Sequence, residues 1–282
     1  MGAVEQLGEV KPWITSLQDY LKPYWNGLID GPWGEGVANG RLTLEQMQGW
    51  ILQIYPFIHA FPKFLAEALI KVEDDYSRSF FITNIRVEKG HAEHWIWMGE
   101  GFGLKADDML ALADGTKSLL RDVQSLTDWL WYINTKGSLA EAVAATSYAI
   151  EGIAGDIARK VPAGFKFYKD RPGVDLSAKT YRWMREHAHY DDENPKIALE
   201  IVGRYATNDR MQTRVMLAAK RSLQLLNNAL LTSIDAYAPA TAASPQVEQD
   251  LRKQDRRAQQ VTIGFPERRF RERRGMAVPV AV

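Results

Sequence analysis

Apolar residues recur every three or four positions along most of the chain, which is the spacing of one face of an α-helix. Segments in which apolar and polar residues alternate, as in a half-buried strand, are scarce. Capping boxes at Thr43–Gln46 and Ser138–Glu141 mark two helix starts, because each pairs a side-chain oxygen with the free amides of a first turn. Glycine and proline at 31–36 and 171–173 predict loops. The pattern therefore predicts an all-α fold with about eight helices between residues 10 and 237.

The character of the chain changes after Tyr237. A Pro/Ala-rich stretch comes first, and a polar segment with many arginines follows it. We therefore predict a helical domain over residues 1–237 and a basic C-terminal extension over residues 238–282. Charge runs usually form a solvated tail, although this one could bind a protein partner. Aromatic residues, on which bases stack, are nearly absent from it, so we do not expect nucleic-acid binding.

The composition excludes several classes of protein. The chain has no cysteine, which rules out disulfides, thiolate metal sites and a cysteine nucleophile. Lys plus Arg and Asp plus Glu both total 35, so no net charge attracts the molecule to nucleic acid or to anionic membranes. No apolar run is long enough to span a bilayer, and the first residues lack the order of a signal peptide. We expect a cytoplasmic protein that does not enter the membrane.

Residues that can bind metals are most concentrated between positions 84 and 95. On one helix, Glu88 and His91 lie about 60° apart and so share a face. Apolar residues occupy the same side: Phe80, Val87, Trp95 and Met98. Glu88 and His91 should therefore point inward, where a buried carboxylate beside an imidazole needs a compensating partner. A metal ion is one such partner, and a hydrogen bond between the two side chains is the alternative.

Two possible metal motifs compete between residues 181 and 195. Glu186 and His189 fall on a polar arc beside two arginines, whereas His187 and Asp191 lie about 40° apart on an apolar side. The inward pair should therefore be His187 and Asp191. Asn194 continues the same stripe.

A further helix supplies Glu151, at the edge of an apolar stripe. The alternative is a glutamate at the rim of the core with its carboxylate in water. Together the candidate ligands form a mixed nitrogen and oxygen set that suits iron or manganese: Glu88, His91, Glu151, His187 and Asp191. We expect His59 and His94 to be hydrogen-bonded in the core or to support the ligands. Several aromatic residues could line an apolar substrate pocket or simply pack: Trp50, Tyr55, Phe57, Phe61, Trp129, Trp131 and Tyr148.

The sequence resembles the haem-oxygenase-like superfamily, which includes pyrroloquinoline-quinone synthase, the TenA-like proteins and the haem-oxygenase-like di-iron oxidases. The resemblance covers about residues 15–237 and is carried by segments 44–50, 91–104 and 187–202. It implies a haem-oxygenase-like helical bundle, a homodimer, and metal ligands at the same five positions. The superfamily's His-x-x-x-Asp-x-x-His motif usually ends in a histidine. This chain has Asn194 there, and its amide is a poorer iron ligand.

The leading hypothesis is a non-haem iron-dependent oxidase or oxygenase that activates O2 on a small organic substrate. One or two irons, or manganese, would be held by the candidate ligands, with His91 and His187 as catalytic residues. One alternative is a cofactor-free oxidase like the quinone synthase, in which the same histidines transfer protons. Another is a non-catalytic helical scaffold that binds a partner and whose site has decayed.

Overall fold

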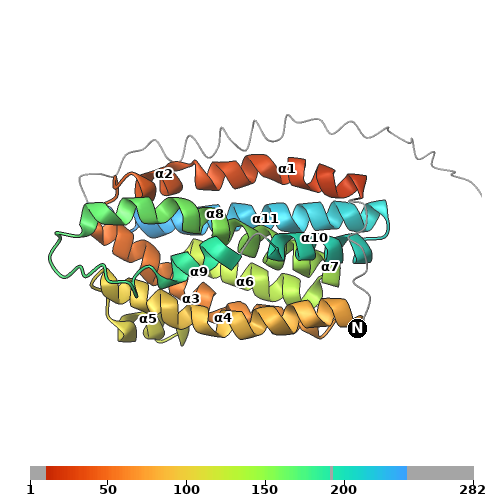
Figure 1. Cartoon of the computed structure of the whole chain (residues 1–282), viewed down its shortest axis with the longest axis horizontal. Helices are drawn as coiled ribbons and strands as arrows, with labels where there is room; N and C mark the ends of the chain where they lie inside the picture. Colours follow the sequence, from red (N-terminus) through yellow and green to blue (C-terminus); the bar gives the residue numbers. More distant parts are fainter. Residues whose placement is uncertain (1–10, 191–192, 240–282) are drawn as a thin grey trace, which may run out of the picture. The chain divides into compact units, whose positions relative to one another are not determined.

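A computed structural model describes residues 11–190 and 193–239 (Figure 1). The chain divides into two units, Met1–Pro239 and Ala240–Val282, and all the described helices belong to the first. Most of the predicted basic extension, together with Asp191, lies outside the described residues. Every regular element within the described ranges is helical, which confirms the predicted all-α class.

The described part of the chain contains eleven α-helices, one π-helix and one 3₁₀-helix. They are α1 (Pro12–Ile29), α2 (Pro32–Ala38), α3 (Leu44–Leu69), α4 (Asp75–Gly101), α5 (Ala106–Ala113), α6 (Arg121–Lys136), α7 (Leu139–Ala142), η1 (Val143–Glu151, π), α8 (Gly152–Lys160), η2 (Val161–Tyr168, 3₁₀), α9 (Arg182–Tyr190), α10 (Asn194–Tyr205) and α11 (Asp209–Asp235). The number of helices exceeds the predicted eight partly because one unbroken stretch, from α7 to η2, changes its hydrogen-bond pattern three times and so counts as four elements.

Both predicted capping boxes are present. Thr43 Oγ1 accepts from the amide of Gln46, whose side chain accepts in turn from the amide of Thr43. Ser138 and Glu141 make the same reciprocal pair at the start of α7. The prediction of a loop at residues 31–36 is wrong, because α2 occupies most of it. Proline suits the first position of a helix, and the buried side chain of Trp33 anchors the turn to the core.

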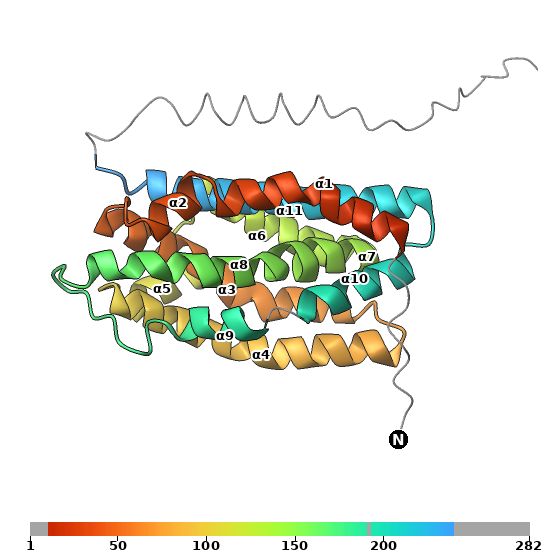
Figure 2. The same ribbon diagram turned by 45° about the horizontal axis from the view of Figure 1, so that its top comes forward.

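The packing around α4, α9 and η1 determines where the functional residues meet. Helices α3 and α4 pack side by side, and α11 packs against η1, α6 and α3. Helix α9 contacts both α4 and α8 and lies between them in Figure 2. Side chains on α4, α9 and the end of η1 can therefore converge on one region of the interior.

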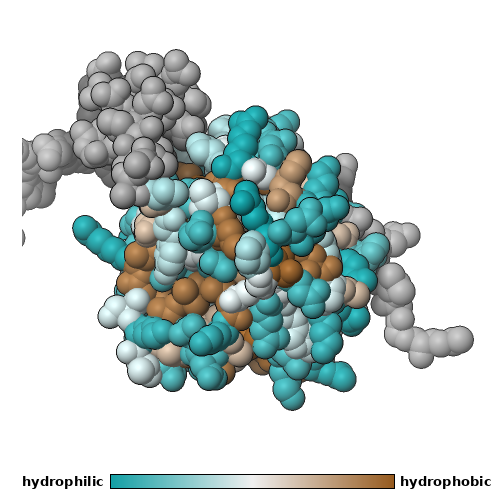
Figure 3. Space-filling view, turned by 90° about the vertical axis from the view of Figure 1, so that its left-hand side faces the viewer, coloured by the Kyte–Doolittle hydropathy of each residue, from teal (hydrophilic) through white to brown (hydrophobic). Residues whose placement is uncertain are grey.

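The surface at one end of the bundle carries hydrophilic side chains with apolar areas between them (Figure 3). In the described ranges, the large apolar side chains that are exposed are few and scattered along the chain, from Ile70 to Leu217. Among the described helices, none has the length and apolar character needed to cross a bilayer.

Candidate metal centre

Helix α4 turns Glu88 and His91 into the core, as the apolar phase of the segment predicts. Their exposed fractions are 4% and 3%. Lys89 and Glu93, on the opposite face, are more accessible. The carboxylate and the imidazole lie one turn apart, with 2.9 Å between Glu88 Oε2 and His91 Nδ1. This segment therefore brings an oxygen and a nitrogen ligand to one point.

Helix α9 turns His187, and not His189, toward the core. His187 is buried, with 3% of its surface exposed, whereas His189 is exposed. The ring of His187 stacks on that of Trp183 at 3.7 Å between centroids and lies 4.2 Å from the ring of His91. The inward residue of this turn is therefore His187, and it faces the ligands supplied by α4.

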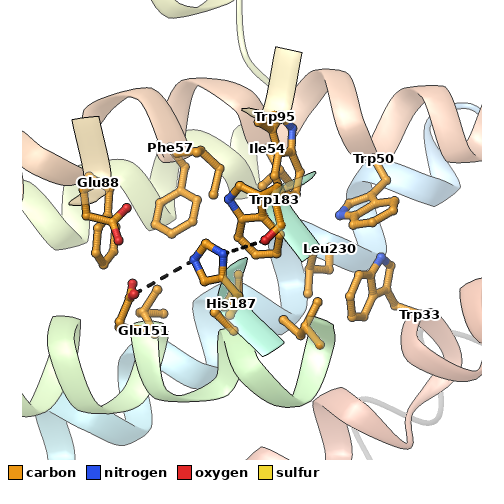
Figure 4. A pocket seen from close by; sticks show the side chains of 16 residues that line it. Trp33, Trp50, Ile54, Phe57, Glu88, Trp95, Glu151, Trp183, His187 and Leu230 are labelled. Carbon is orange, nitrogen blue, oxygen red and sulfur yellow. Dashed lines mark hydrogen bonds and ion pairs between the residues drawn. The ribbon is translucent and has the colours of Figure 1, made fainter. Parts of the chain in front are cut away.

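The orientation of His187 is set by its own helix. Its Nδ1 lies 3.0 Å from the backbone oxygen of Trp183. A carbonyl oxygen can only accept, so Nδ1 carries the proton and Nε2 has a free lone pair. This arrangement is typical of metal-binding histidines, whose second nitrogen is fixed by a hydrogen bond. His187 Nε2 points toward Glu151 Oε1, 4.0 Å away (Figure 4).

Glu151 is the last residue of the π-helix η1. The eight residues before it, 143–150, are all buried, and the Glu151 side chain is 12% exposed. Glu151 therefore lies at the edge of the core, as predicted, with its carboxylate toward His187 instead of toward water. A π-helix is rare and often occurs at a functional site. Nothing in the apolar pattern of this segment distinguishes it from an α-helix.

The cluster favours neutral imidazoles in the absence of a cation. Burial lowers the pKa of His187 well below its ordinary value, and the neighbouring His91 lowers it further. Burial also lowers the pKa of His91, against the opposing effect of Glu151 and Glu186. Burial and the nearby carboxylate of Glu88 raise the pKa of Glu151 well above its usual range. The folded chain alone therefore holds both imidazoles neutral and favours a protonated Glu151.

The donor atoms form a group that could hold a single metal ion. One ligand atom each from Glu88, His91 and His187 lies within 4.8 Å of the other two. Two ligands about 2.1 Å from one ion lie about 3 Å apart at right angles and about 4.2 Å apart on opposite sides. Although His91 Nδ1 is close to Glu88, neither ring nitrogen of His91 makes a hydrogen bond, and both are buried. A cation would satisfy the one nitrogen that carries the lone pair, and the nitrogen and oxygen set suits iron or manganese.

Glu186 is the residue whose position was predicted least well. The sequence places it on a polar arc, and it does contact the exposed Arg182. Its other oxygen, however, lies 2.7 Å from His94 Nδ1 and 3.8 Å from His91 Nε2. Glu186 therefore supports the edge of the cluster through His94, which fits the expectation for His94. The periodicity of one helix does not predict which residues of another helix its side chains contact.

Asn194 does not join the cluster. Its side-chain amide donates to Asn84 Oδ1 at 2.9 Å, and Asn84 donates to the backbone oxygen of Phe80. The amide is thus used in a contact between α10 and α4. The predicted ligand Asp191 lies outside the described residues, so its place in the site stays a prediction.

An apolar cavity of about 50 Å³ adjoins the ligands (Figure 4). Glu88, Glu151 and His187 contribute to its wall, and aliphatic and aromatic side chains make up the rest. Of the aromatic residues suggested for a substrate pocket, three line this cavity: Trp50, Phe57 and Phe61. The cavity gives a small apolar molecule a place beside the candidate ligands.

Comparison with solved structures shows the class of fold. A TenA homologue from Pseudomonas syringae pv. tomato superposes with a TM-score of 0.71 at 23% identity, covering 83% of this chain and 97% of that one. A domain of unknown function with a haem-oxygenase-like fold, from Shewanella denitrificans, superposes with a TM-score of 0.66 at 16% identity, covering 82% and 96%. These structures confirm the predicted haem-oxygenase-like bundle.

The chain belongs to the TENA/THI-4/PQQC family, which it matches over residues 18–208. It is also 29% identical over 89 residues to the pyrroloquinoline-quinone synthase of Klebsiella pneumoniae. That match covers 29% of this chain and 36% of the synthase, so the chain spans little more than a third of that relative's length. The predicted superfamily is therefore confirmed.

Proposed function

We propose that this protein is a non-haem iron-dependent oxidase or oxygenase that acts on a small organic substrate. The observation that carries the proposal is the buried group of Glu88, His91 and His187, whose donor atoms lie within 4.8 Å of one another, with Glu151 beside His187. Without a cation, the buried nitrogen of His91 that carries the lone pair has no partner. Iron, when bound, supplies the redox chemistry with O2 that side chains lack.

The chain's own residues prepare the site. Iron would be held by Glu88 and His91 on α4, His187 on α9 and Glu151 at the end of η1. The carbonyl of Trp183 fixes the His187 ring, so its Nε2 stays available. Burial excludes bulk water and leaves the apolar cavity as the place for a substrate.

The test is iron uptake followed by O2 consumption, with two histidines of one helix compared. His187→Ala should lower the affinity for Fe²⁺ by about 100-fold or more and abolish O2 consumption. His189→Ala removes an exposed imidazole two residues away and should change neither. Equal iron uptake by the wild type and His187→Ala would contradict the proposal.

The similarity to pyrroloquinoline-quinone synthase favours a second candidate, cofactor-free oxidation of a bound substrate. In that case His91 and His187, which burial keeps neutral, would accept protons from the substrate. Activity that survives complete removal of metal by a chelator supports this candidate. Activity that is lost with the metal and returns with Fe²⁺ supports the iron-dependent oxidase.

A further inference from the structure

The two histidines of the candidate metal centre are held in different ways. The backbone oxygen of Trp183 fixes the ring of His187, because it holds the proton on Nδ1 and leaves Nε2 free. His91 lacks such a hydrogen bond, since neither of its ring nitrogens has a partner among the described residues. A ligating histidine almost always donates its second N–H to a carboxylate, a backbone oxygen or water. Another group must therefore fix the ring of His91 when a cation binds.

The surroundings of His91 distinguish its two ring nitrogens. Nδ1 lies 2.9 Å from Glu88 Oε2, yet the two atoms are not aligned as a hydrogen bond. Two ligands at right angles on one ion lie about 3 Å apart, which matches this separation. Nδ1 is therefore the nitrogen that would bind a cation together with Glu88. A neutral imidazole carries one proton, so that proton then lies on Nε2.

The acidic side chain on the Nε2 side of the ring is Glu186, on α9. Its Oε2 lies 3.8 Å from His91 Nε2 and 2.7 Å from His94 Nδ1. Its Oε1 accepts a hydrogen bond from Nε of Arg182 at 2.5 Å. The Glu186 side chain is 19% exposed, whereas that of Arg182 is 52% exposed. Glu186 thus reaches from an arginine at the surface to the buried ring of His91.

A small movement would complete the contact between Glu186 and Nε2. An N–H···O hydrogen bond has about 2.9 Å between its heavy atoms, so the carboxylate oxygen has to approach the ring by about 0.9 Å. Hydrogen bonds at functional sites often shorten only when the site is loaded, and a glutamate has several rotatable bonds. A carboxylate oxygen has two lone pairs, so Oε2 can accept from His91 while it stays beside His94.

We propose that Glu186 is a positioning residue for the candidate metal centre. It accepts a hydrogen bond from the Nε2–H of His91 and so keeps Nδ1 directed at the cation. Glu186 itself is not among the residues whose ligand atoms lie within 4.8 Å of one another. The inference rests on the proposed function, because it needs a cation held by Glu88, His91 and His187.

Metal affinity is measured by titrating metal-free protein with Mn²⁺, whose electron paramagnetic resonance signal distinguishes free from bound ion. Glu186→Ala should lower the affinity about 10- to 100-fold, because the ring of His91 loses its acceptor. Glu186→Gln keeps an acceptor oxygen and should recover part of the loss. Glu93→Ala is the matched control, because Glu93 is an exposed glutamate on the same helix as His91. It should change the affinity by less than about twofold, since salt screens an exposed charge.

His94→Ala separates a direct effect on His91 from an effect that passes through His94. If Glu186 acts on His91 itself, His94→Ala weakens Mn²⁺ binding much less than Glu186→Ala does. Glu186→Ala should then also weaken binding when His94 is already alanine. Equal losses from the two single changes, with no further loss in the double variant, would overturn the proposal. Thermal unfolding of each variant shows that it is folded.

The position of the proton on His91 is observed by ¹⁵N NMR of protein loaded with Zn²⁺, which is diamagnetic and takes nitrogen and oxygen ligands. The chain has five histidines, and variants that each lack one of them assign the signals. We expect the proton of His91 on Nε2 in the wild type and partly on Nδ1 in Glu186→Ala. A glutamate that only stabilised the fold would leave this position unchanged. A proton on Nδ1 in the loaded wild type overturns the proposal.

The same titration distinguishes the two proposals. If the wild type takes up neither Fe²⁺ nor Mn²⁺, the proposed function fails and the role of Glu186 fails with it. If the wild type binds Mn²⁺ and Glu186→Ala binds it equally well, only the role of Glu186 is removed.

Discussion

Asn194 occupies the position at which the motif of the superfamily usually ends in histidine, and it serves a different purpose in this protein. Its amide donates to Asn84 across two helices. Asn194→Ala should therefore lower the free energy of unfolding by about 1 kcal/mol, because the acceptor on Asn84 loses its partner. Iron uptake should stay unchanged. Urea unfolding and elemental analysis check the two parts.

A double-mutant cycle with Asn84→Ala tests whether the hydrogen bond is the cause. The coupling energy between the two changes should be about 0.5–1.5 kcal/mol. If Asn194→Ala lowers iron affinity as strongly as His187→Ala does, Asn194 is a ligand and its assignment to a purely structural contact is wrong.

For single residues, the sequence predicts whether a side chain faces the core better than it predicts which residue that side chain contacts. The helical periodicity correctly predicts that Glu88, His91 and His187 face the core, because each shares a helix face with apolar neighbours. It could not predict that Glu186 reaches His94 or that Asn194 reaches Asn84, because both contacts join different helices. The phase of one helix carries no information about the rotation of its neighbour.

At the level of elements, the two capping boxes fix where helices begin. Ser138 caps the start of the unbroken stretch that leads through η1 to Glu151. Its capping partner Glu141 also accepts hydrogen bonds from Arg214 through both carboxylate oxygens, at 2.9 and 2.8 Å. Ser138→Ala should lower the free energy of unfolding by about 1 kcal/mol, because the first turn loses an acceptor. Chemical denaturation measures the loss.

Thr43→Ala is the matched change at the start of α3 and should cost a similar amount. Neither variant should alter iron uptake, since neither residue lies among the candidate ligands. A loss of iron in Ser138→Ala alone would show that the cap also sets the position of Glu151 along the stretch.

Two elements show why boundaries and helix types were harder to predict than helical class. The signals that favour a loop at residues 31–36 are its glycines and proline, yet the proline begins α2 and Trp33 is buried. Along η1, every residue from 143 to 150 is buried, so no polar face reveals the number of residues per turn. Tertiary packing decided both cases, and local sequence does not encode it.

At the level of the whole molecule, the buried imidazoles make the folded state sensitive to acid. Burial lowers the pKa of His91 and His187 below the ordinary 6.5, so below that pH the unfolded chain binds two protons that the folded chain does not. Glu151 opposes this effect, because its raised pKa lets the folded chain keep one proton that the unfolded chain releases above 4.5. Because more than one imidazole opposes a single carboxyl group, the unfolded state holds the larger number of protons once the pH lies well below 6.5. Stability should therefore fall as the pH is lowered through this range.

A bound cation should make this dependence steeper. It keeps Glu151 ionised and both imidazoles unprotonated, so the folded chain then holds none of the three protons. The unfolded chain then holds a larger excess of protons over the folded chain, and the fall in stability with falling pH becomes steeper. Urea unfolding across this range, with and without saturating Mn²⁺ as a redox-stable substitute for iron, measures both slopes. Equal slopes would show that the cation does not bind among these residues, and a reversed slope without metal would show that the imidazoles are not held neutral by the fold.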